Sequence, residues 1–435
     1  MKLSTQPYKG ARDFFPEDMR MQKYIFSKWR EICERFGYEE YTAPIIESVE
    51  IYEAKSGQEI VNEEMYVFTD RGDRRVALRP EMTPTVSRMV AARRQELGYP
   101  LRWYSIPNLW RYDRPQRGRL REHWQLNVDI FGVSGVAAEH EIIMVADTIM
   151  QSFGAKRNMY EIRINSRKFV DHLLKGYLDL DDVEAHTVAK LIDKMHKMTR
   201  GEFIALCEAA VSPAHRKTGA IDKLMTVLDS KTAEELPRDL STHESLDNLA
   251  ILMGMLEKNG VVNARFDTTL MRGFDYYTDI VFEVFDMHPD NNRSLFGGGR
   301  YDGLVGMFGV EPVPTVGFGQ GDVGMELFIE AHDLLPKLQT ETELYIVLAG
   351  DIYEQAQGLL NALRNEGVNV AIDTSGKKIG AQIKTADKKG VTYIIVVGEQ
   401  ELETMRFKLK NLKTAKEEEL SLERIIATVK DRRLK

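Results

Sequence analysis

Apolar residues recur at helical spacing near the start of the chain. They lie three or four residues apart at Ile25, Trp29, Ile32 and Phe36. This spacing predicts a helix from Pro16 to Phe36, since proline is tolerated in the first turn of a helix. One face of the helix is apolar, so that face is expected to lie against other parts of the protein.

The stretch after this helix alternates apolar and polar residues around a proline. Residues 38–47 alternate about Pro44, and a proline inside a strand belongs at a sheet edge or at an interface. Further strand-like runs, separated by charged turns, occupy residues 64–80, 100–112 and 123–131. Because no regular helices separate these runs, they predict an antiparallel sheet rather than alternating βαβ units. The helix together with the proline-containing strand suits a contact between subunits.

The pattern changes twice in the second half of the chain. Strand signals fade over residues 168–245, where apolar residues keep helical spacing, which predicts an inserted helical unit. From residue 342, strands alternate with helices, which predicts a compact α/β domain with a mainly parallel sheet over residues 342–435. Its strands are expected at residues 344–348, 368–372 and 393–397, and its helices at 352–365, 378–389 and 422–430. Residues 331–341 are interpreted as a linker, and residues 1–330 as an α+β domain interrupted by the insertion.

Composition and charge narrow the class of protein. The chain has 435 residues, and no apolar run approaches the roughly 20 residues that cross a bilayer, so no membrane partner is expected. The N-terminus lacks the apolar stretch of a secretory signal, and two cysteines are too few for a disulfide framework, which favours a cytoplasmic location. The net charge of -8 argues against indiscriminate nucleic-acid binding, and DNA is not expected as a partner. The histidines show no metal-ligand spacing, so no metal site is expected.

One polar segment lies between two strand-like runs. Its sequence is Arg272-Gly-Phe-Asp-Tyr-Tyr-Thr, with apolar flanks at residues 266–271 and 280–285. Arginine keeps its charge and suits a carboxylate or a phosphate, so Arg272 is expected to face either Asp275 or an anionic ligand. The alternative to ligand binding is a structural ion pair between these two residues.

A second polar stretch holds five arginines in the eleven residues from Arg111 to Arg121. Its proline, glutamine and glycine suit a loop that joins two strands, and guanidinium groups are well suited to fixing phosphates. The alternative is a solvated charged hairpin. The strand that follows has period two, which puts four polar residues on one face: His123, Gln125, Asn127 and Asp129. This face is predicted to be a binding surface.

These motifs resemble those of the class II aminoacyl-tRNA synthetases. Arg111-Tyr-Asp with His123-Trp-Gln resembles their motif 2, residues 37–47 resemble motif 1, and Leu78-Arg-Pro-Glu-Met-Thr resembles the turn that binds the amino acid. Three more peptides are similar to signatures of the histidyl-tRNA synthetases: Lys9-Gly-Ala-Arg-Asp, Arg272-Gly-Phe-Asp-Tyr-Tyr and Gly298-Gly-Arg-Tyr-Asp-Gly-Leu. The resemblance implies a class II catalytic domain over residues 1–330 and an anticodon-binding domain over residues 342–435.

The resemblance also implies roles for single residues. Glu81, Thr83 and Gln125 would hold the α-amino group of L-histidine, while Asp129, Tyr276, Tyr277 and Tyr301 would recognise the rest of it, above all the imidazole. Arg111 and Arg272 would act in catalysis, by stabilising charge at the α-phosphate of ATP. ATP, carried with Mg²⁺ as a substrate, would also meet Arg119, Arg121 and His123, and no prosthetic group is implied. Arg114 and Gln116 would reach the acceptor end of histidine tRNA.

The chain departs from the family pattern at three places. Asp129 stands where glutamate is common, so the side chain is one methylene shorter. His123, with Trp124 beside it, stands where a phenylalanine usually stacks on adenine. In motif 3, Gly324 occupies the position of the arginine that clamps ATP. We expect Arg119 or Arg121, with Mg²⁺ near Asp322, to supply the lost charge.

The resemblance therefore implies a homodimeric ligase that forms histidyl-adenylate and transfers histidine to its tRNA. The C-terminal domain would contribute positive charge to tRNA binding from Lys377, Lys384, Lys388 and Lys389, although a solvated lysine face is the alternative. Two other functions stay open. One is a synthetase paralogue without ligase activity that senses histidine as a regulatory subunit of histidine biosynthesis. The other is a tRNA-binding sensor or structural partner.

Overall fold

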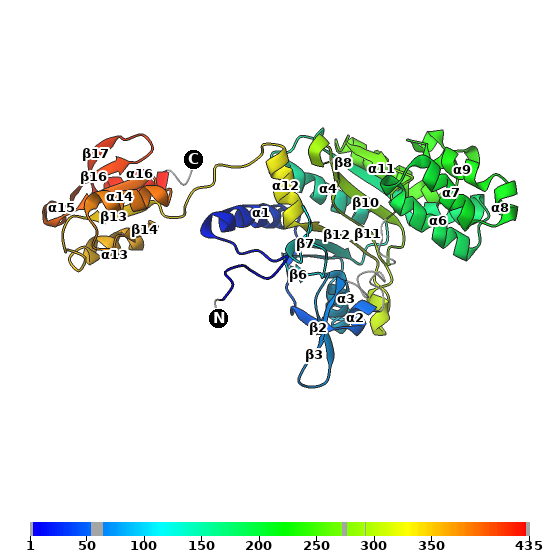
Figure 1. The fold of residues 1–435 in the computed structure, drawn as a ribbon, viewed down its shortest axis with the longest axis horizontal. Helices are drawn as coiled ribbons and strands as arrows, with labels where there is room; N and C mark the ends of the chain where they lie inside the picture. The colour runs from blue at the N-terminus through cyan, green and yellow to red at the C-terminus, as the bar shows by residue number, and fades with distance from the viewer. Residues whose placement is uncertain (1–2, 54–63, 272–275, 292, 432–435) are drawn as a thin grey trace. The chain divides into compact units, whose positions relative to one another are not determined.

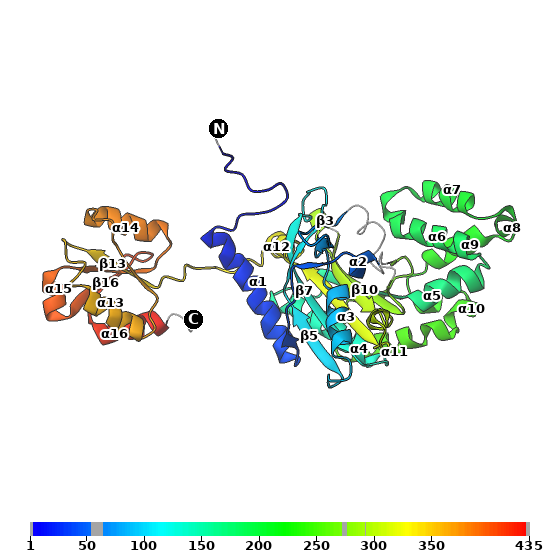
Figure 2. The same ribbon diagram turned by 90° about the horizontal axis from the view of Figure 1, so that it is seen from below.

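The computed structural model describes residues 3–53, 64–271, 276–291 and 293–431. The chain forms two compact units (Figures 1 and 2). The first unit comprises Met1–Asp13 and Gln22–Leu335, and the second comprises Phe14–Met21 and Pro336–Lys435. No helix in the described part of the chain is both long enough and apolar enough to cross a membrane.

A nine-stranded sheet forms the centre of the first unit. Its order is β1 (Glu39–Glu40), β5 (Leu101–Ser105), β7 (Glu122–Phe131), β12 (Thr315–Gly321), β11 (Ser294–Arg300), β10 (Ile280–Asp286), β8 (Tyr160–Ser166) and β9 (Ala264–Phe266), and β6 (Asn108–Trp110) pairs with β7. Neighbours from β5 to β8 are antiparallel, whereas the short strands β1 and β9 run parallel to theirs. The predicted antiparallel α+β fold is confirmed.

Glycines on β12 leave space beside β7. Gly317 pairs with Asp129, and Gly319 pairs with Asn127, across the antiparallel ladder between β12 and β7. A Cβ on Gly317 would overlap the Asp129 carboxylate, and one on Gly319 would overlap the Gln125 amide. The glycine-rich sequence of β12 therefore makes room for the polar side chains that β7 presents.

Helices cover this sheet. The predicted first helix is present as α1 (Pro16–Arg35), with Trp29 and Cys33 fully buried. The helices α4 (Ala137–Ser152) and α12 (Asp322–Ala331) both pack against β7 and β12, and α11 (Asp247–Lys258) packs on α4. The first unit thus buries its apolar helix faces against a sheet whose centre carries polar residues and glycines.

The single strand predicted over residues 38–47 is wrong. The stretch divides into β1 and β2 (Ile46–Ser48), because the carbonyls of Ala43 and Pro44 accept hydrogen bonds from the Arg79 guanidinium instead of from a ladder. The second strand joins a separate three-stranded sheet, β2-β4-β3, with β3 (Tyr66–Thr69) and β4 (Arg75–Leu78). Helices α2 (Glu50–Glu53) and α3 (Thr83–Ala92) pack on each other beside it.

The strand predicted over residues 266–271 is also too long. The strand β9 ends at Phe266, since the Asp267 side chain accepts hydrogen bonds from the Thr269 main chain, at 2.9 Å, and from its hydroxyl. Such a local bond turns the chain out of the extended conformation.

Helices alone form the stretch between β8 and β9, all of which is described. Capping boxes start two of them, at Asp181 with Glu184 and at Thr199 with Glu202. The helices are α5 (Arg167–Asp171), α6 (Asp182–Lys194), α7 (Arg200–Ala210), α8 (Pro213–Lys217), α9 (Ala220–Leu228) and α10 (Arg238–Ser241), followed by α11. The predicted helical character of the insertion is confirmed.

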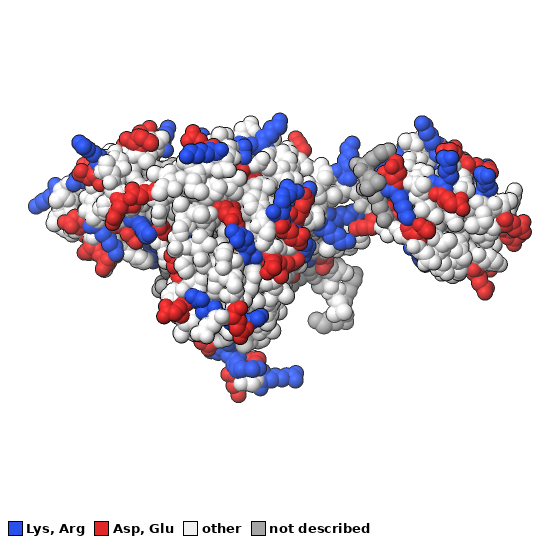
Figure 3. Space-filling view, turned by 180° about the vertical axis from the view of Figure 1, so that it is seen from behind, with Lys and Arg blue, Asp and Glu red and all other residues white. Residues whose placement is uncertain are grey.

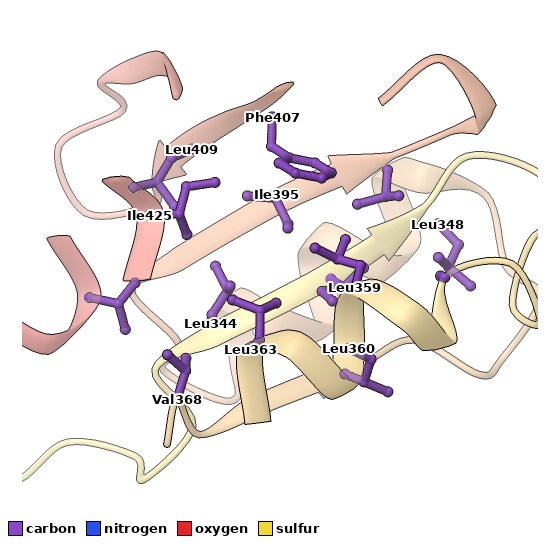
Figure 4. Packing of buried hydrophobic residues seen from close by; sticks show 14 of the residues in the cluster. Leu344, Leu348, Leu359, Leu360, Leu363, Val368, Ile395, Phe407, Leu409 and Ile425 are labelled. Atoms are coloured by element: carbon purple, nitrogen blue, oxygen red, sulfur yellow. The ribbon is translucent and has the colours of Figure 1, made fainter. Parts of the chain in front are cut away.

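The second unit contains a five-stranded sheet. Its order is β14 (Val370–Ile372), β13 (Leu344–Leu348), β15 (Tyr393–Val397), β16 (Arg406–Asn411) and β17 (Glu417–Ser421), with helices α13 (Gln357–Asn365), α14 (Ile379–Lys388), α15 (Glu399–Thr404) and α16 (Leu422–Asp431). Figure 4 shows Leu359 and Leu363 of α13 packed towards Ile395 and Phe407 of the sheet. The predicted strands β13, β14 and β15 are parallel, whereas the antiparallel strands β16 and β17 were missed because they are rich in charge.

Candidate active site

Two adjoining cavities open beside the polar face of β7. The larger cavity has a volume of about 310 Å³, and the smaller one about 140 Å³. The larger cavity is lined by residues that include Glu81, Thr83, Arg111, Arg119, His123, Gln125, Asn127, Asp129, Tyr276, Tyr277 and Tyr301. Arg111, Arg119 and His123 line the smaller cavity as well, so the two form one continuous cleft. Most of the residues singled out from the sequence therefore meet here.

Buried carboxylates lie at two places in the larger cavity. Glu81 is 3% exposed, and its Oε2 accepts a hydrogen bond of 3.3 Å from the Tyr276 hydroxyl. Asp129 is 4% exposed, and the Tyr301 hydroxyl donates a short hydrogen bond to it. Each carboxylate thus has a tyrosine partner, and a bound molecule with two separate donor groups would fit this arrangement.

Burial raises the pKa of the Asp129 carboxyl to about 7, and the hydrogen bond from Tyr301 opposes that rise only in part. The carboxyl is therefore ready to accept a hydrogen bond from an N–H donor at and above neutral pH, and it needs such a partner once it is charged. A site of this kind favours a ligand that brings its own donor.

The Asp129→Asn variant is expected to gain stability relative to the original protein, both without ligand, as the pH rises. The folded-state pKa of Asp129, about 7, lies above the ordinary value of 3.8, so the protein loses stability as the pH rises from about 4 to about 7 and loses no more above it. The variant lacks this loss, which amounts to roughly 3 kcal/mol between pH 5 and pH 8. Thermal unfolding of both proteins at these two pH values measures it. An equal advantage of the variant at both would contradict the burial of a titrating carboxyl.

The turn that carries Glu81 is anchored by Arg79. The Arg79 guanidinium is buried and donates to the carbonyls of Asn108, at 3.0 Å, and Ala43, at 2.7 Å. Thr83 then begins α3, with Pro84 in the first turn, where a missing N–H does no harm. The sequence Leu78-Arg-Pro-Glu-Met-Thr therefore places the Glu81 carboxylate and the Thr83 hydroxyl at the N-terminus of α3.

A similar anchor holds Tyr301. Arg300 is 4% exposed and forms a paired contact with Glu139 of α4, with Nε–Oε1 at 2.5 Å and the second nitrogen at 2.7 Å from Oε2. It also donates to the carbonyls of Val133 and Gly135. Arg300 does not line the cleft, so its role in the Gly-Gly-Arg-Tyr-Asp peptide is to fix the end of β11 and thereby the tyrosine that follows.

The polar residues of β7 share one cavity, as their period-two spacing predicts. His123, Gln125, Asn127 and Asp129 all line the larger cavity. Gln125 Nε2 donates to Asn127 Oδ1 at 3.0 Å, which turns the Gln125 carbonyl oxygen to other partners. Burial, with the nearby charges of Arg111 and Arg12, lowers the pKa of His123 to about 3, so its imidazole is neutral at physiological pH. Trp124 is absent from the lining of both cavities.

Some residues of the arginine-rich loop line the two cavities, whereas others are exposed to solvent. Arg111 lines both cavities, and its Nε donates to the Pro80 carbonyl at 2.9 Å. Arg119 lines both as well and lies 3.3 Å from Asp113. Arg114 and Gln116 are exposed, Gln116 at the turn it forms with Arg119. The loop therefore presents two of its arginines to the cleft and others to solvent.

Arg121 differs from the prediction, because the structure places it outside the lining of both cavities. Its guanidinium lies over the Tyr112 ring, 3.9 Å from the centroid, and donates to the Asp113 carbonyl and the Tyr8 hydroxyl. Arg121 thus holds the loop against the N-terminal segment. Of the two arginines expected to replace the motif 3 clamp, only Arg119 reaches the cleft.

Asp322 is likewise engaged elsewhere. Its Oδ2 lies 2.7 Å from an Arg12 nitrogen, and its Oδ1 accepts from the Trp124 main chain at 3.0 Å. Within the described residues no group of three His, Cys, Asp or Glu side chains could hold a metal ion. The expectation of Mg²⁺ near Asp322 has no support in the contacts of this carboxylate.

Two residues at the smaller cavity were missed in the sequence. Arg293 and Asn291 line it, next to Gly324 of α12. The only signal in the sequence was that Arg293 is a basic residue just before the glycines of β11. This position does not show in which direction the Arg293 side chain points. Arg272 and Asp275 lie outside the residues that the structure describes.

The cleft thus combines two chemistries. The larger cavity offers buried carboxylates to a cationic or N–H-donating molecule, whereas the smaller one is bordered by Arg111, Arg119 and Arg293 and suits an anion. Since Arg111 lines both, a group bound in the first cavity can meet a phosphate bound in the second at this residue.

Comparison with known proteins agrees with this arrangement. The family model described as Histidyl-tRNA synthetase matches residues 10–320, and the model described as Anticodon binding domain matches residues 343–432. A histidine–tRNA ligase of Leptospira biflexa serovar Patoc is 41% identical over 435 residues, covering 99% of this chain and 98% of its own. One from Haloarcula marismortui is 37% identical over 410 residues, covering 93% of both chains. The crystal structure of apo S. aureus histidyl-tRNA synthetase matches with a TM-score of 0.73 at 26% identity, over 98% of this chain and 100% of that one.

Proposed function

Because the chain belongs to the histidyl-tRNA synthetase family, it is a ligase that activates L-histidine with ATP and transfers it to tRNA, and we propose that the cleft beside β7 is its active site. The observation that carries this proposal is the meeting of two tyrosine-bonded carboxylates with arginines in one cleft. The carboxylate of histidine attacks the α-phosphorus of ATP, diphosphate leaves, and the adenylate then gives histidine to the tRNA, with release of AMP.

The larger cavity would bind histidine. Glu81, supported by Thr83 and Gln125, would pair with the α-ammonium, because a buried carboxylate favours a cationic partner. Asp129 would accept one imidazole N–H, and the tyrosines Tyr276, Tyr277 and Tyr301 would close around the ring. Amino acids without such donors would give the buried Asp129 carboxyl no partner besides Tyr301, which is a strong basis for rejecting them.

ATP would lie across the smaller cavity. Arg111, which borders both cavities, would hold the α-phosphate while charge builds on its oxygens, and Arg119 would assist. His123 is neutral and offers an aromatic face to adenine. Mg²⁺ would arrive with ATP as part of the substrate, bound chiefly to phosphate oxygens.

The division into parts is proposed as follows. Residues 1–330 form the catalytic domain with its insertion at 168–245, residues 331–341 are the linker, and residues 342–435 bind the anticodon. The match of the anticodon-binding model to residues 343–432 supports the last assignment. Lys377, Lys384, Lys388 and Lys389 are all exposed and could meet the RNA backbone. Arg114 and Gln116, exposed on the arginine-rich loop, would reach the acceptor end.

We also propose that the protein is a homodimer and works in the cytoplasm. Large apolar side chains on and beside the sheet β2-β4-β3 are 40–46% exposed, and a subunit contact would bury them: Ile45, Ile46, Val67 and Phe68. Figure 3 shows charges of both signs at the tip of the β3–β4 hairpin, a polar border beside these strands. The mass at sedimentation equilibrium should be twice the 49.8 kDa of one chain, and a monomer would overturn the dimer. The cysteines Cys33 and Cys207 are free and buried, an arrangement that suits a reducing compartment.

The test of the active site is histidine-dependent exchange of pyrophosphate into ATP, followed by charging of histidine tRNA. Both reactions should occur, and both should require histidine. Exchange without charging would favour a paralogue that only senses histidine, and absence of exchange at saturating substrates would remove the assignment of the cleft.

A further inference from the structure

There is unfilled space beside Gly324 in the wall of the smaller cavity. The nearest heavy atom to a Cβ at this position would be the Leu295 carbonyl oxygen, 3.5 Å away. A Cβ therefore fits at this position without displacing its neighbours. Since glycine has none, the first turn of α12 contributes no charge to the cavity at this position.

Arg293, just before β11, lines the same cavity. One terminal nitrogen of its side chain donates to the Arg117 carbonyl at 2.8 Å. The same nitrogen would lie 2.5 Å from a Cβ on Gly118, whose φ of +81° is in the left-handed region. Gly118 thus leaves the space that the Arg293 guanidinium occupies, and the contact ties β11 to the arginine-rich loop.

Among the described residues, most of the hydrogen-bonding capacity of Arg293 is unused. A guanidinium has five N–H donors, and a single contact accounts for one of them. No carboxylate among the described residues forms an ion pair with Arg293, whereas Arg119 is paired with Asp113 in the same cavity. The charged lining comprises three arginines and one aspartate: Arg111, Arg119, Arg293 and Asp113. The cavity therefore has an excess of positive charge, and Arg293 contributes to it without a carboxylate partner among the described residues.

We propose that Arg293 binds the outer phosphates of ATP and supplies the positive charge that position 324 lacks. This inference rests on the proposed function of the cleft. Phosphate oxygens, rather than the adenine ring, are assigned to Arg293 because its free donors are polar, while an apolar wall is available for the ring: Leu120, Leu295, Val323 and Leu327. The loop contact holds the guanidinium in place before ATP arrives, which lowers the entropic cost of binding.

Arg293→Ala is expected to raise the KM for ATP in pyrophosphate exchange by about 10- to 100-fold and to change the KM for histidine less than twofold. Arg293→Lys should lie between, since it keeps the charge and loses the planar fork. Arg265→Ala is the matched control, because Arg265 is 70% exposed and pairs with Glu161 away from the cleft. Melting curves check that each variant is folded.

Equilibrium titration separates phosphate binding from support of the loop. The loss in Arg293→Ala should be large for ATP and small for AMP, which lacks the outer phosphates. Equal losses for both nucleotides would show that Arg293 only positions the loop, and unchanged affinity for ATP would also overturn the proposal.

The double variant Arg293→Ala/Gly324→Arg should recover at least a tenth of the affinity for ATP that Arg293→Ala loses. The reason is that position 324 lines the same cavity as Arg293. Failure of this second change to restore any affinity would contradict a shared role of the two positions. Absence of exchange in the unaltered protein would instead remove the proposed function of the cleft, while the nucleotide titrations would still decide the role of Arg293.

Discussion

Arg111→Ala is expected to lower histidine-dependent pyrophosphate exchange by about 100- to 1000-fold, the size of loss seen when a preorganised donor to a developing oxyanion is removed. Arg111 borders the carboxylate-bearing cavity and the cation-rich cavity alike; Arg119 does so too, but Arg119 is paired with Asp113. Its Nε is already held by the Pro80 carbonyl at 2.9 Å, so the guanidinium needs little reorganisation when charge develops on the α-phosphate. The effect should appear in kcat, because this contact strengthens in the transition state.

Arg117→Ala is the control for this change. Arg117 belongs to the same loop and is exposed, and only its main-chain carbonyl takes part in the cleft, through Arg293. Its side chain can therefore be removed without loss of exchange. Arg111→Lys separates charge from geometry, since lysine keeps the charge but cannot make paired contacts. Exchange within tenfold of the original in Arg111→Ala would show that another group carries the charge stabilisation.

Regular periodicity explains what was predictable in this site. The four polar residues of β7 were placed on one face because side chains alternate along a strand, and β7 pairs with its neighbours without interruption over these residues. The glycines of β11 and β12 were visible in the sequence, but neither stretch was predicted as a strand, and the use of Gly317 became clear only from the register that sets it opposite Asp129. Spacing along one strand determines which of its side chains share a face. The register between paired strands determines which residues lie opposite those side chains.

Directions of long side chains in loops were not predictable. Arg119 and Arg121 are two residues apart in one basic stretch, yet one lines the cleft and the other stacks on Tyr112. The difference arises from the N-terminal segment, where the Gly10 carbonyl accepts from the Arg121 main chain at 2.8 Å and Tyr8 meets the guanidinium. Arg293 was missed for the same reason, because only the folded chain brings it to the smaller cavity. Such contacts join residues far apart in sequence, and no local pattern encodes them.

Glu81→Gln is expected to lower kcat/KM for histidine by about 100- to 1000-fold while the KM for ATP changes little. The substitution keeps the shape of the side chain and removes its charge, so the ammonium of bound histidine would lie in a buried site without its counter-ion, at a cost of about 3–5 kcal/mol. Steady-state exchange at varied histidine and fixed saturating ATP measures the loss. The decisive result is that the loss affects the kinetics for histidine and not the KM for ATP, since Glu81 lines only the larger cavity.

Two further variants set the scale of the Glu81 effect. Tyr276→Phe removes the 3.3 Å hydrogen bond to Glu81 but leaves the carboxylate, so its loss should be about tenfold. Glu122→Gln removes a carboxylate of β7 that accepts from Asn108 outside both cavities, and it should leave the kinetics unchanged. If Glu81→Gln weakened ATP and histidine alike, Glu81 would have to act by supporting the turn before α3. The ammonium of histidine would then need another carboxylate, and Asp129, the other buried acid of the larger cavity, would be the residue to change next.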